Sequence, residues 1–234
     1  MDKKNKGVIL VSGGLDSTTV LAIAKSKGED IFALSFDYGQ RHRIELESAK
    51  KVADYYKVPH QIIKIDLRQI GGSALTDNIA VPKDRSVTEI SSSIPITYVP
   101  GRNTIFLSYA MAVAETISSA VIYIGANVLD YSGYPDCRPE YLKAFETMAN
   151  LAMATKEKNI SSLEIRAPLL YLSKGEIVKK GKDLSVPFHL THSCYDPVPT
   201  GQSCGRCDSC LLRKKGFSEA GVDDPISYDA GINH

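Results

Sequence analysis

The sequence predicts an α/β fold, in which helices cover both faces of a doubly wound, mainly parallel sheet, followed by a small cysteine-rich C-terminal segment. Short apolar runs alternate with segments of helical spacing, which is typical of repeated βα units. A glycine-rich turn joins the first run to the first helical segment, and four cysteines crowd into residues 194–210. We expect an α/β domain over residues 1–190 and a C-terminal segment over residues 191–234, packed on that domain.

The first expected strand is residues 8–11, a β-branched apolar run. Residues 18–27 then have the apolar spacing of a helix, which ends at Gly28. The same patterns predict further strands over residues 31–36, 61–65, 120–124 and 163–167. They predict further helices over residues 44–56, 103–118, 139–155 and 174–184.

Two of these regions have special features. The helix over residues 44–56 is expected to bury an apolar stripe formed by Val52, Tyr55 and Tyr56. Residues 71–100 are rich in Ser, Thr, Asp, Gly and Pro and show little periodicity, so they predict a long loop. Loops of that length inside a domain are usually functional or mobile.

The bulk composition excludes several classes of protein. The 234 residues carry a net charge of only +1, so the basic excess of a protein that grips a long nucleic-acid backbone is missing. No apolar run is long enough to span a bilayer, and no signal segment precedes the first strand. We expect a cytoplasmic protein with a small-molecule substrate, no nucleic-acid partner and no membrane association. In that compartment, crowded cysteines favour a metal site over disulfides.

The turn after the first strand reads SGGLDS, over residues 12–17. Glycines let backbone amides approach an anion closely, and a helix N-terminus adds unpaired N–H groups and a partial positive charge. The turn lacks the lysine of a Walker A loop and does not match GxGxxG. It matches SGGxDS, the phosphate loop of the PP-loop ATP pyrophosphatases. The simpler alternative is a tight strand-to-helix turn capped by Ser or Asp.

Four cysteines have the spacing C-x9-C-x2-C-x2-C, at Cys194, Cys204, Cys207 and Cys210. Four thiolates can close a tetrahedron around Zn²⁺, and such a site is structural because no position stays open. An iron–sulfur cluster tolerates similar spacing. A redox pair would explain only two of the four thiols, so we favour zinc.

A polar loop follows the expected strand over residues 120–124, again at the carboxyl edge of the sheet. It is dense in carboxylates, hydroxyls and tyrosines, which can bind the polar edge of a guanine and stack on its face. We take Asp130, Ser132, Tyr134, Asp136 and Arg138 as candidate substrate-binding residues. Cys137 among them is equally well explained as a small buried side chain.

Five motifs occur in order along the chain: SGGLDS, SFDYGQRHRIE, TYVPGRNTIFLS, GANVLDYSGYPDCRPEY and SCYDP…CGRCDSCLLRKKGF. Together they resemble the 7-cyano-7-deazaguanine synthase family of PP-loop enzymes over nearly the whole chain. The resemblance implies a carbon–nitrogen ligase that converts 7-carboxy-7-deazaguanine and ammonia to the nitrile through adenylated intermediates, for queuosine or archaeosine synthesis. It also implies ATP with Mg²⁺, one structural zinc per chain and a homodimer. The family commonly has Gln where Leu15 stands here.

The resemblance implies roles for the motif residues. The expected ATP-binding residues are Val11, Ser12, Gly13, Gly14, Leu15, Asp16, Ser17, Thr18 and Asp37. Asp16 would serve Mg²⁺ or the loop structure, because a carboxylate repels phosphate. Arg102 and Lys174 would neutralise charge on the phosphates or the substrate carboxylate, and Arg41 and His42 are further candidates for nucleotide contact.

Two rival functions remain open at this point. A PP-loop enzyme can instead adenylate a base in tRNA, although such enzymes usually carry a basic face and added RNA-binding segments. A zinc-stabilised nucleotide-binding module without activity would leave the polar loop after residue 124 unexplained.

Overall fold

Five parallel strands form one sheet in the order β3-β2-β1-β4-β5. The structure is a computed structural model, which describes residues 5–86, 89–90, 94–129, 134–154, 160 and 162–229. The strands are β1 (Lys6–Leu10), β2 (Asp30–Asp37), β3 (His60–Lys64), β4 (Val121–Tyr123) and β5 (Glu164–Arg166). The chain order reverses at β1, which lies between β2 and β4. In open α/β sheets a ligand crevice forms at such a point, beyond the carboxyl ends of the strands.

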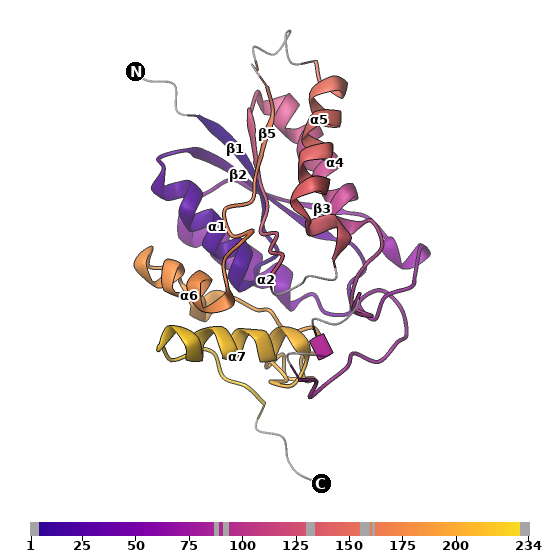
Figure 1. Cartoon of the computed structure of the whole chain (residues 1–234), viewed down its shortest axis with the longest axis vertical. Helices are drawn as coiled ribbons and strands as arrows, with labels where there is room; N and C mark the ends of the chain where they lie inside the picture. The colour runs from indigo at the N-terminus through magenta and orange to yellow at the C-terminus, as the bar shows by residue number, and fades with distance from the viewer. Residues whose placement is uncertain are drawn as a thin grey trace.

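Helices cover both faces of this sheet (Figure 1). α4 (Arg102–Ile117) and α5 (Pro139–Ala152) lie on one face, and α1 (Leu15–Ser26), α2 (Ile44–Tyr56) and α6 (Lys174–Asp183) lie on the other. α7 (Asp208–Ala220) packs against α6, at the end of the molecule where the cysteines lie. Single 3-10 turns occur at Leu67–Gln69, Pro135–Cys137 and Phe188–Leu190.

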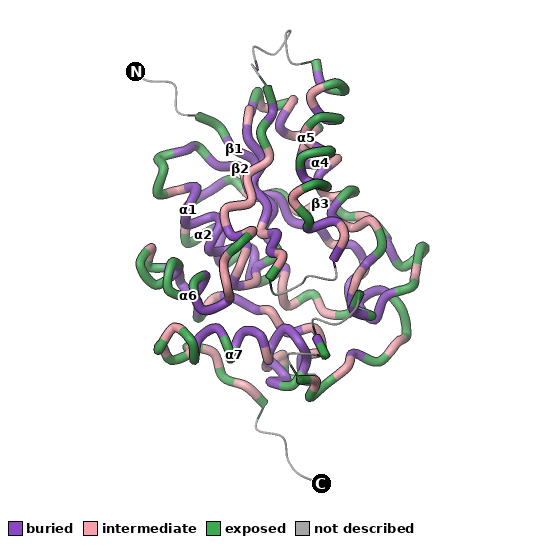
Figure 2. Tube along the Cα trace, viewed as in Figure 1, coloured by how far each residue is buried: buried purple, intermediate pink, exposed green. Residues whose placement is uncertain are grey.

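Strand alternation builds a separate core on each face. Val8 and Leu10 of β1 point into the core beneath α4 and α5, whereas Ile9 points into the core beneath α1 and α6. All three are buried, as a strand covered on both faces requires. The buried tube segments in Figure 2 accordingly concentrate in the sheet and on the inner sides of its helices.

The predicted fold class is confirmed, and every predicted strand and helix is present with ends shifted by up to three residues. The apolar stripe expected on α2 was wrong in part. Val52 is buried as expected, but Tyr55 is 52% exposed, because Leu46 and Ala49 are buried beside Val52 instead. Helix α7 was not predicted, since its cysteine, its charged residues and its internal Gly216 obscure the helical period.

Ion pairs and a β-bridge connect the C-terminal segment to the loop over residues 71–100. Arg85 makes a two-pronged ion pair with the buried Asp208 at the start of α7. Asp84 pairs with Arg206, and Lys83 forms a β-bridge with Cys207.

Within the described residues, no helix combines the length and the hydropathy needed to cross a bilayer.

Candidate active site

A cavity of about 240 Å³ lies beyond the carboxyl ends of β1, β2 and β4, at the point where the strand order reverses. Its walls come from the SGGLDS turn, the segment after β2, the start of α4 and the residues around Cys194. Four cationic side chains line it, namely Arg41, Arg102, Lys174 and Arg213. This charge suits a polyanionic ligand.

The SGGLDS turn forms one end of the cavity, which we call the phosphate end. Gly13 has φ +85°, and a Cβ there would lie 2.3 Å from the backbone oxygen of Glu45. Only glycine fits, because the clash is with backbone and the conformation is left-handed. The turn is then held by its own serines, since the Oγ atoms of Ser12 and Ser17 lie 3.1 Å apart.

The N-terminus of α1 faces the phosphate end. Gly14 is the N-cap, and no side chain caps it. The N–H groups of Asp16 and Ser17 have no hydrogen-bond partner among the described residues. Gly125, after β4, comes close enough that a Cβ there would lie 3.3 Å from Ser17 N. Unpaired amides and the helix dipole make this end a site for an anion such as phosphate.

Lys174 places a cation at the same end. Its Nζ lies 2.9 Å from both carboxylate oxygens of Asp16, and the side chain is 5% exposed. The aliphatic part passes over Gly216 of α7, where a Cβ would lie 2.3 Å from Lys174 Cγ. Glycine at position 216 therefore allows the α6–α7 contact that aims the ammonium group at the turn.

The C-terminal segment completes the phosphate end. The N–H of His192 donates to Gly13 O at 2.9 Å, and Ser193 Oγ accepts from Leu15 N at 3.3 Å. Sequence reasoning missed both contacts, because nothing local in the sequence links residues so far apart. His192, Ser193, Cys194 and Tyr195 thus supply part of the cavity wall.

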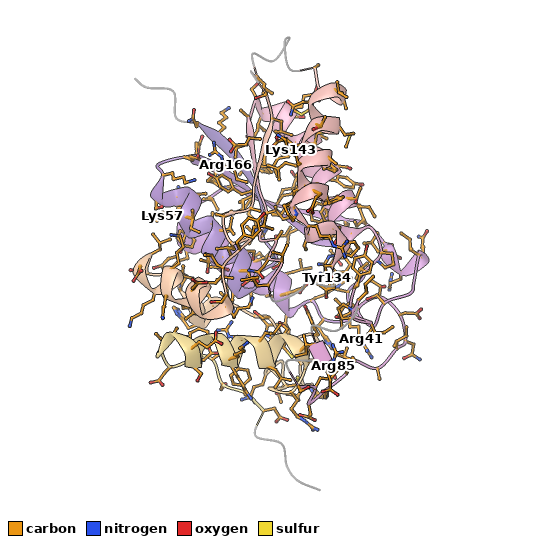
Figure 3. The ribbon with its side chains drawn as sticks, viewed as in Figure 1. Arg41, Lys57, Arg85, Tyr134, Lys143 and Arg166 are labelled. Carbon is orange, nitrogen blue, oxygen red and sulfur yellow. The ribbon has the colours of Figure 1, made fainter. Side chains whose placement is uncertain are left out.

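A second part of the cavity lining, which we call the acceptor end, includes Tyr38, Glu45, Arg102 and Tyr134, whose charges act on one another. Burial alone would lower the pKa of Arg102, but the surrounding Tyr38, Tyr134, Tyr195 and Asp136 raise it, so the guanidinium stays charged. Burial raises the pKa of Tyr38, with a smaller contribution from Glu45. Figure 3 shows Tyr134 on the side of the molecule where Arg41 and Arg85 also lie, away from Arg166 and Lys143.

Most predicted residues meet at this cavity. Its lining includes Val11, Ser12, Gly14, Leu15, Asp16, Ser17, Arg102, Tyr134 and Lys174, and also Arg41 and His42. Gly13 belongs to the same turn but is not part of the lining, and the buried Thr18 donates its hydroxyl to Gly14 O at 2.8 Å. Asp130 and Ser132 lie outside the described residues.

Besides Gly13 and Thr18, three predicted residues lie outside the cavity lining. Asp37 ends β2, and its carboxylate is 3.5 Å from Arg43 Nη2. Asp136 is buried and accepts a hydrogen bond from Asn103 N at 3.2 Å, so it caps the first turn of α4. Arg138 is exposed at the start of α5. Asp136 thus positions Arg102 through the helix, whereas Cys137 itself lines the cavity.

The four predicted cysteines come together. Their Sγ atoms lie within 4.8 Å of one another, all four residues are buried, and Cys194 Sγ is 3.9 Å from Cys207 Sγ. A Zn–S bond of about 2.3 Å implies sulfur–sulfur edges of about 3.8 Å in a tetrahedron. Backbone N–H groups point at the sulfurs, as from Cys204 to Cys194 Sγ at 3.3 Å, which stabilises thiolates. The cluster fits a four-thiolate metal site.

Comparison with known proteins decides the family. The chain matches the family described as "Queuosine biosynthesis protein QueC" over residues 6–221. A 7-cyano-7-deazaguanine synthase of Syntrophus aciditrophicus is 57% identical over 226 residues, which are 96% of this chain and 98% of that protein. One of Solidesulfovibrio magneticus is 58% identical and covers 97% of each chain. The chain belongs to the QueC family.

Membership in the QueC family confirms the resemblance predicted from the five motifs, and with it an enzyme of queuosine biosynthesis. Among solved structures, NMN synthetase from Francisella tularensis is similar with a TM-score of 0.48 and 14% identity, covering 97% of this chain and 89% of that chain. A likeness this distant carries no functional information.

Proposed function

We propose that the protein is a 7-cyano-7-deazaguanine synthase, which uses ATP and ammonia to turn the carboxylate of 7-carboxy-7-deazaguanine into a nitrile. The observation that carries the proposal is the high identity to synthases along nearly their whole length. The cavity supports it, because an anion site at the end of β1 and a partly buried cation, Arg102, line one space.

The first step makes the carboxylate reactive. A carboxylate oxygen attacks the α-phosphorus of ATP, the α–β phosphoric anhydride bond breaks, and pyrophosphate leaves with the bonding electrons. The turn amides and Lys174 would hold the β- and γ-phosphates, while Arg102 would face the substrate carboxylate. No protein nucleophile is needed, so catalysis rests on positioning and on neutralising charge.

The later steps exchange oxygen for nitrogen. Ammonia attacks the adenylated carbon, and AMP leaves to give the amide. The amide oxygen attacks a second ATP, pyrophosphate leaves again, and loss of AMP together with two N–H protons gives the nitrile. Each ATP thus removes one oxygen from the substrate as AMP.

The Cys194, Cys204, Cys207 and Cys210 cluster would hold one structural zinc ion, which supplies a crosslink and takes no part in the reaction. Mg²⁺ would accompany ATP. Of the predicted ATP-binding carboxylates, Asp16 lines the cavity and Asp37 does not, so Asp16 is the candidate for contact with Mg²⁺. Its ion pair with Lys174 also helps to hold the shape of the turn. A cytoplasmic location and a homodimer stay predictions.

The test is to incubate the protein with ATP, ammonium and 7-carboxy-7-deazaguanine. We expect AMP, pyrophosphate and the nitrile. AMP formed only with tRNA would support the RNA-modifying rival, and ATP binding without turnover of any acceptor would support the binding module. Ser17→Ala should greatly lower turnover without unfolding the protein, since it removes a hydroxyl at the α1 N-terminus; unchanged turnover would contradict the phosphate assignment.

A further inference from the structure

Glu45 is a carboxylate that the reaction scheme leaves without a task. It lies in the first turn of α2 and lines the same cavity as Ser12 and Arg102. A carboxylate repels phosphate, so its presence in an anion-binding cavity calls for a cation or a proton as its partner. Sequence reasoning missed Glu45, because an acidic residue in the first turn of a helix is ordinary.

Three hydrogen bonds determine the orientation of Glu45. Gln40 Oε1 accepts from Tyr38 N at 2.8 Å, so the amide NH₂ of Gln40 must point the other way. That NH₂ donates to Phe36 O at 3.1 Å and to Glu45 Oε1 at 2.8 Å, which uses both of its protons. Glu45 Oε1 is therefore held as an acceptor by the end of β2.

The second carboxylate oxygen of Glu45 is available to a ligand. No described residue makes a hydrogen bond to Oε2, and no described ion pair includes Glu45. Burial raises the pKa of Glu45 to about 7, against the lowering effects of the Gln40 hydrogen bond and the Arg102 charge. Near neutral pH the group can therefore both take up and release a proton.

Two aromatic rings line the same cavity as Glu45. The Tyr38 and Phe106 ring centroids lie 5.5 Å apart, the charge of Glu45 acts on Tyr38, and Phe106 stacks on Phe36 at 3.9 Å. Aromatic faces attract cations such as an ammonium ion. The nitrogen source is ammonium at neutral pH, and it must lose a proton before it can attack.

We propose that Glu45 Oε2, with the Tyr38 and Phe106 rings, forms the subsite for ammonium and removes its proton. The inference rests on the proposed function. One N–H bond of ammonium breaks, its electron pair stays on nitrogen, and an O–H bond forms at Oε2. The charge of Arg102 acts on both partners of this transfer, because it destabilises ammonium relative to ammonia and also stabilises the Glu45 carboxylate.

Neutral ammonia then lies in the cavity that holds the adenylated carbon. Its lone pair forms the C–N bond, and the C–O bond to AMP breaks with its electrons leaving on AMP. The surplus proton on nitrogen goes with the AMP phosphate, whose second pKa of about 6 lets it accept a proton. Glu45 afterwards releases its own proton to solvent.

The test compares Glu45→Gln with Glu47→Gln. Both substitutions remove one negative charge from the first turn of α2, but Glu47 is exposed, and its carboxylate pairs with Lys50 at 4.0 Å. Substrate-dependent ATP–pyrophosphate exchange reports adenylation without ammonium. Nitrile or amide formation with ammonium reports the nitrogen step. Hydroxylamine, a nucleophile that is largely unprotonated at neutral pH, bypasses the proposed proton transfer.

We expect Glu45→Gln to lower ammonium-dependent turnover by about 100-fold or more, as general-base removal does. Its pyrophosphate exchange should match that of the wild type, and its reaction with hydroxylamine should fall far less. Glu45→Asp should keep part of the ammonium activity, and Glu47→Gln should keep all of it.

Three results would overturn the inference. The first is an equal loss of activity with ammonium and with hydroxylamine in Glu45→Gln. The second is a parallel loss of pyrophosphate exchange in that variant. The third is a raised KM for the heterocyclic substrate with kcat unchanged, which would make Glu45 a residue that binds this substrate. In each case the wild-type protein still catalyses substrate-dependent pyrophosphate exchange, so the proposed function is unaffected. Wild-type protein without any substrate-dependent exchange would overturn both.

Discussion

The two ends of the cavity are built in different ways. The phosphate end is a contiguous turn, residues 12–17, whose shape depends on backbone contacts such as that between Gly13 and Glu45 O. The acceptor end is assembled from side chains on separate elements, with Tyr38 after β2 and Arg102 at the start of α4.

The difference has a physical consequence. Side-chain substitutions cannot remove the backbone amides of the anion site. Apart from loss of the Ser17 hydroxyl or the Lys174 ammonium group, this end is altered where a side chain enters the space that glycine leaves. In a site made of side chains, each substitution removes one functional group and leaves the others in place. Substitutions should therefore disable the phosphate end as a whole and dissect the acceptor end into separate steps.

The largest expected effect is that of Gly13→Ala. The new Cβ would lie 2.3 Å from Glu45 O and 2.6 Å from Ala49 N, and neither backbone atom can move without shifting α2. Strain and overpacking together should cost roughly 2–5 kcal/mol and abolish AMP formation. The matched control is Gly28→Ala, with φ +74° and no atom within 4 Å, which should cost only about 1–2 kcal/mol and keep activity. Thermal unfolding and AMP assays measure both; equal behaviour of the two variants would contradict the close-approach argument.

Cys207→Ala should come next. Removing one of four thiolates should release the metal and lower the unfolding temperature markedly, because structural metal binding is coupled to folding. Activity should fall too, since His192 and Ser193 connect the cysteine segment to the turn. Cys137→Ser, outside the cluster, is the control and should keep one metal ion per chain. A metal-replete, stable Cys207→Ala protein would refute the four-thiolate site.

Lys174→Met should leave the fold intact and weaken the phosphate end. It keeps the buried aliphatic part against Gly216 and removes only the Nζ charge beside Asp16. We expect a loss of kcat/KM for ATP of roughly 100-fold. The exposed Lys179 of the same helix supplies the control, Lys179→Met, which should be silent. Steady-state kinetics decide; a loss below about three-fold would place Lys174 outside the phosphate contacts.

The smallest effect concerns the pH dependence of stability. The pKa of Glu45 is raised to about 7 in the fold from an ordinary value near 4.5. The native state therefore holds this proton over a range where the unfolded chain has lost it, and the contribution to stability declines as pH rises from about 4.5 to 7. Glu45→Gln lacks that decline, so its unfolding temperature relative to wild type should rise over this range and level off above pH 7. A difference independent of pH would show that Glu45 is solvated.

The contiguous features were predictable from sequence, and the assembled ones were not. The strand pattern, the SGGLDS turn and the cysteine spacing are local, so each indicates its own structure. The task of Glu45 depends on Gln40 and on a cavity formed by distant elements. Asp136 shows the reverse error, because a carboxylate that suits a ligand pocket instead caps α4.

The most direct test of the account follows the oxygen atoms of the substrate. The turn is proposed to hold ATP so that its α-phosphorus meets a carboxylate oxygen at the acceptor end. With 7-carboxy-7-deazaguanine labelled with ¹⁸O in the carboxylate, mass spectrometry of the products should find the label in AMP and none in pyrophosphate. Unlabelled AMP, or ADP and orthophosphate in its place, would contradict the account.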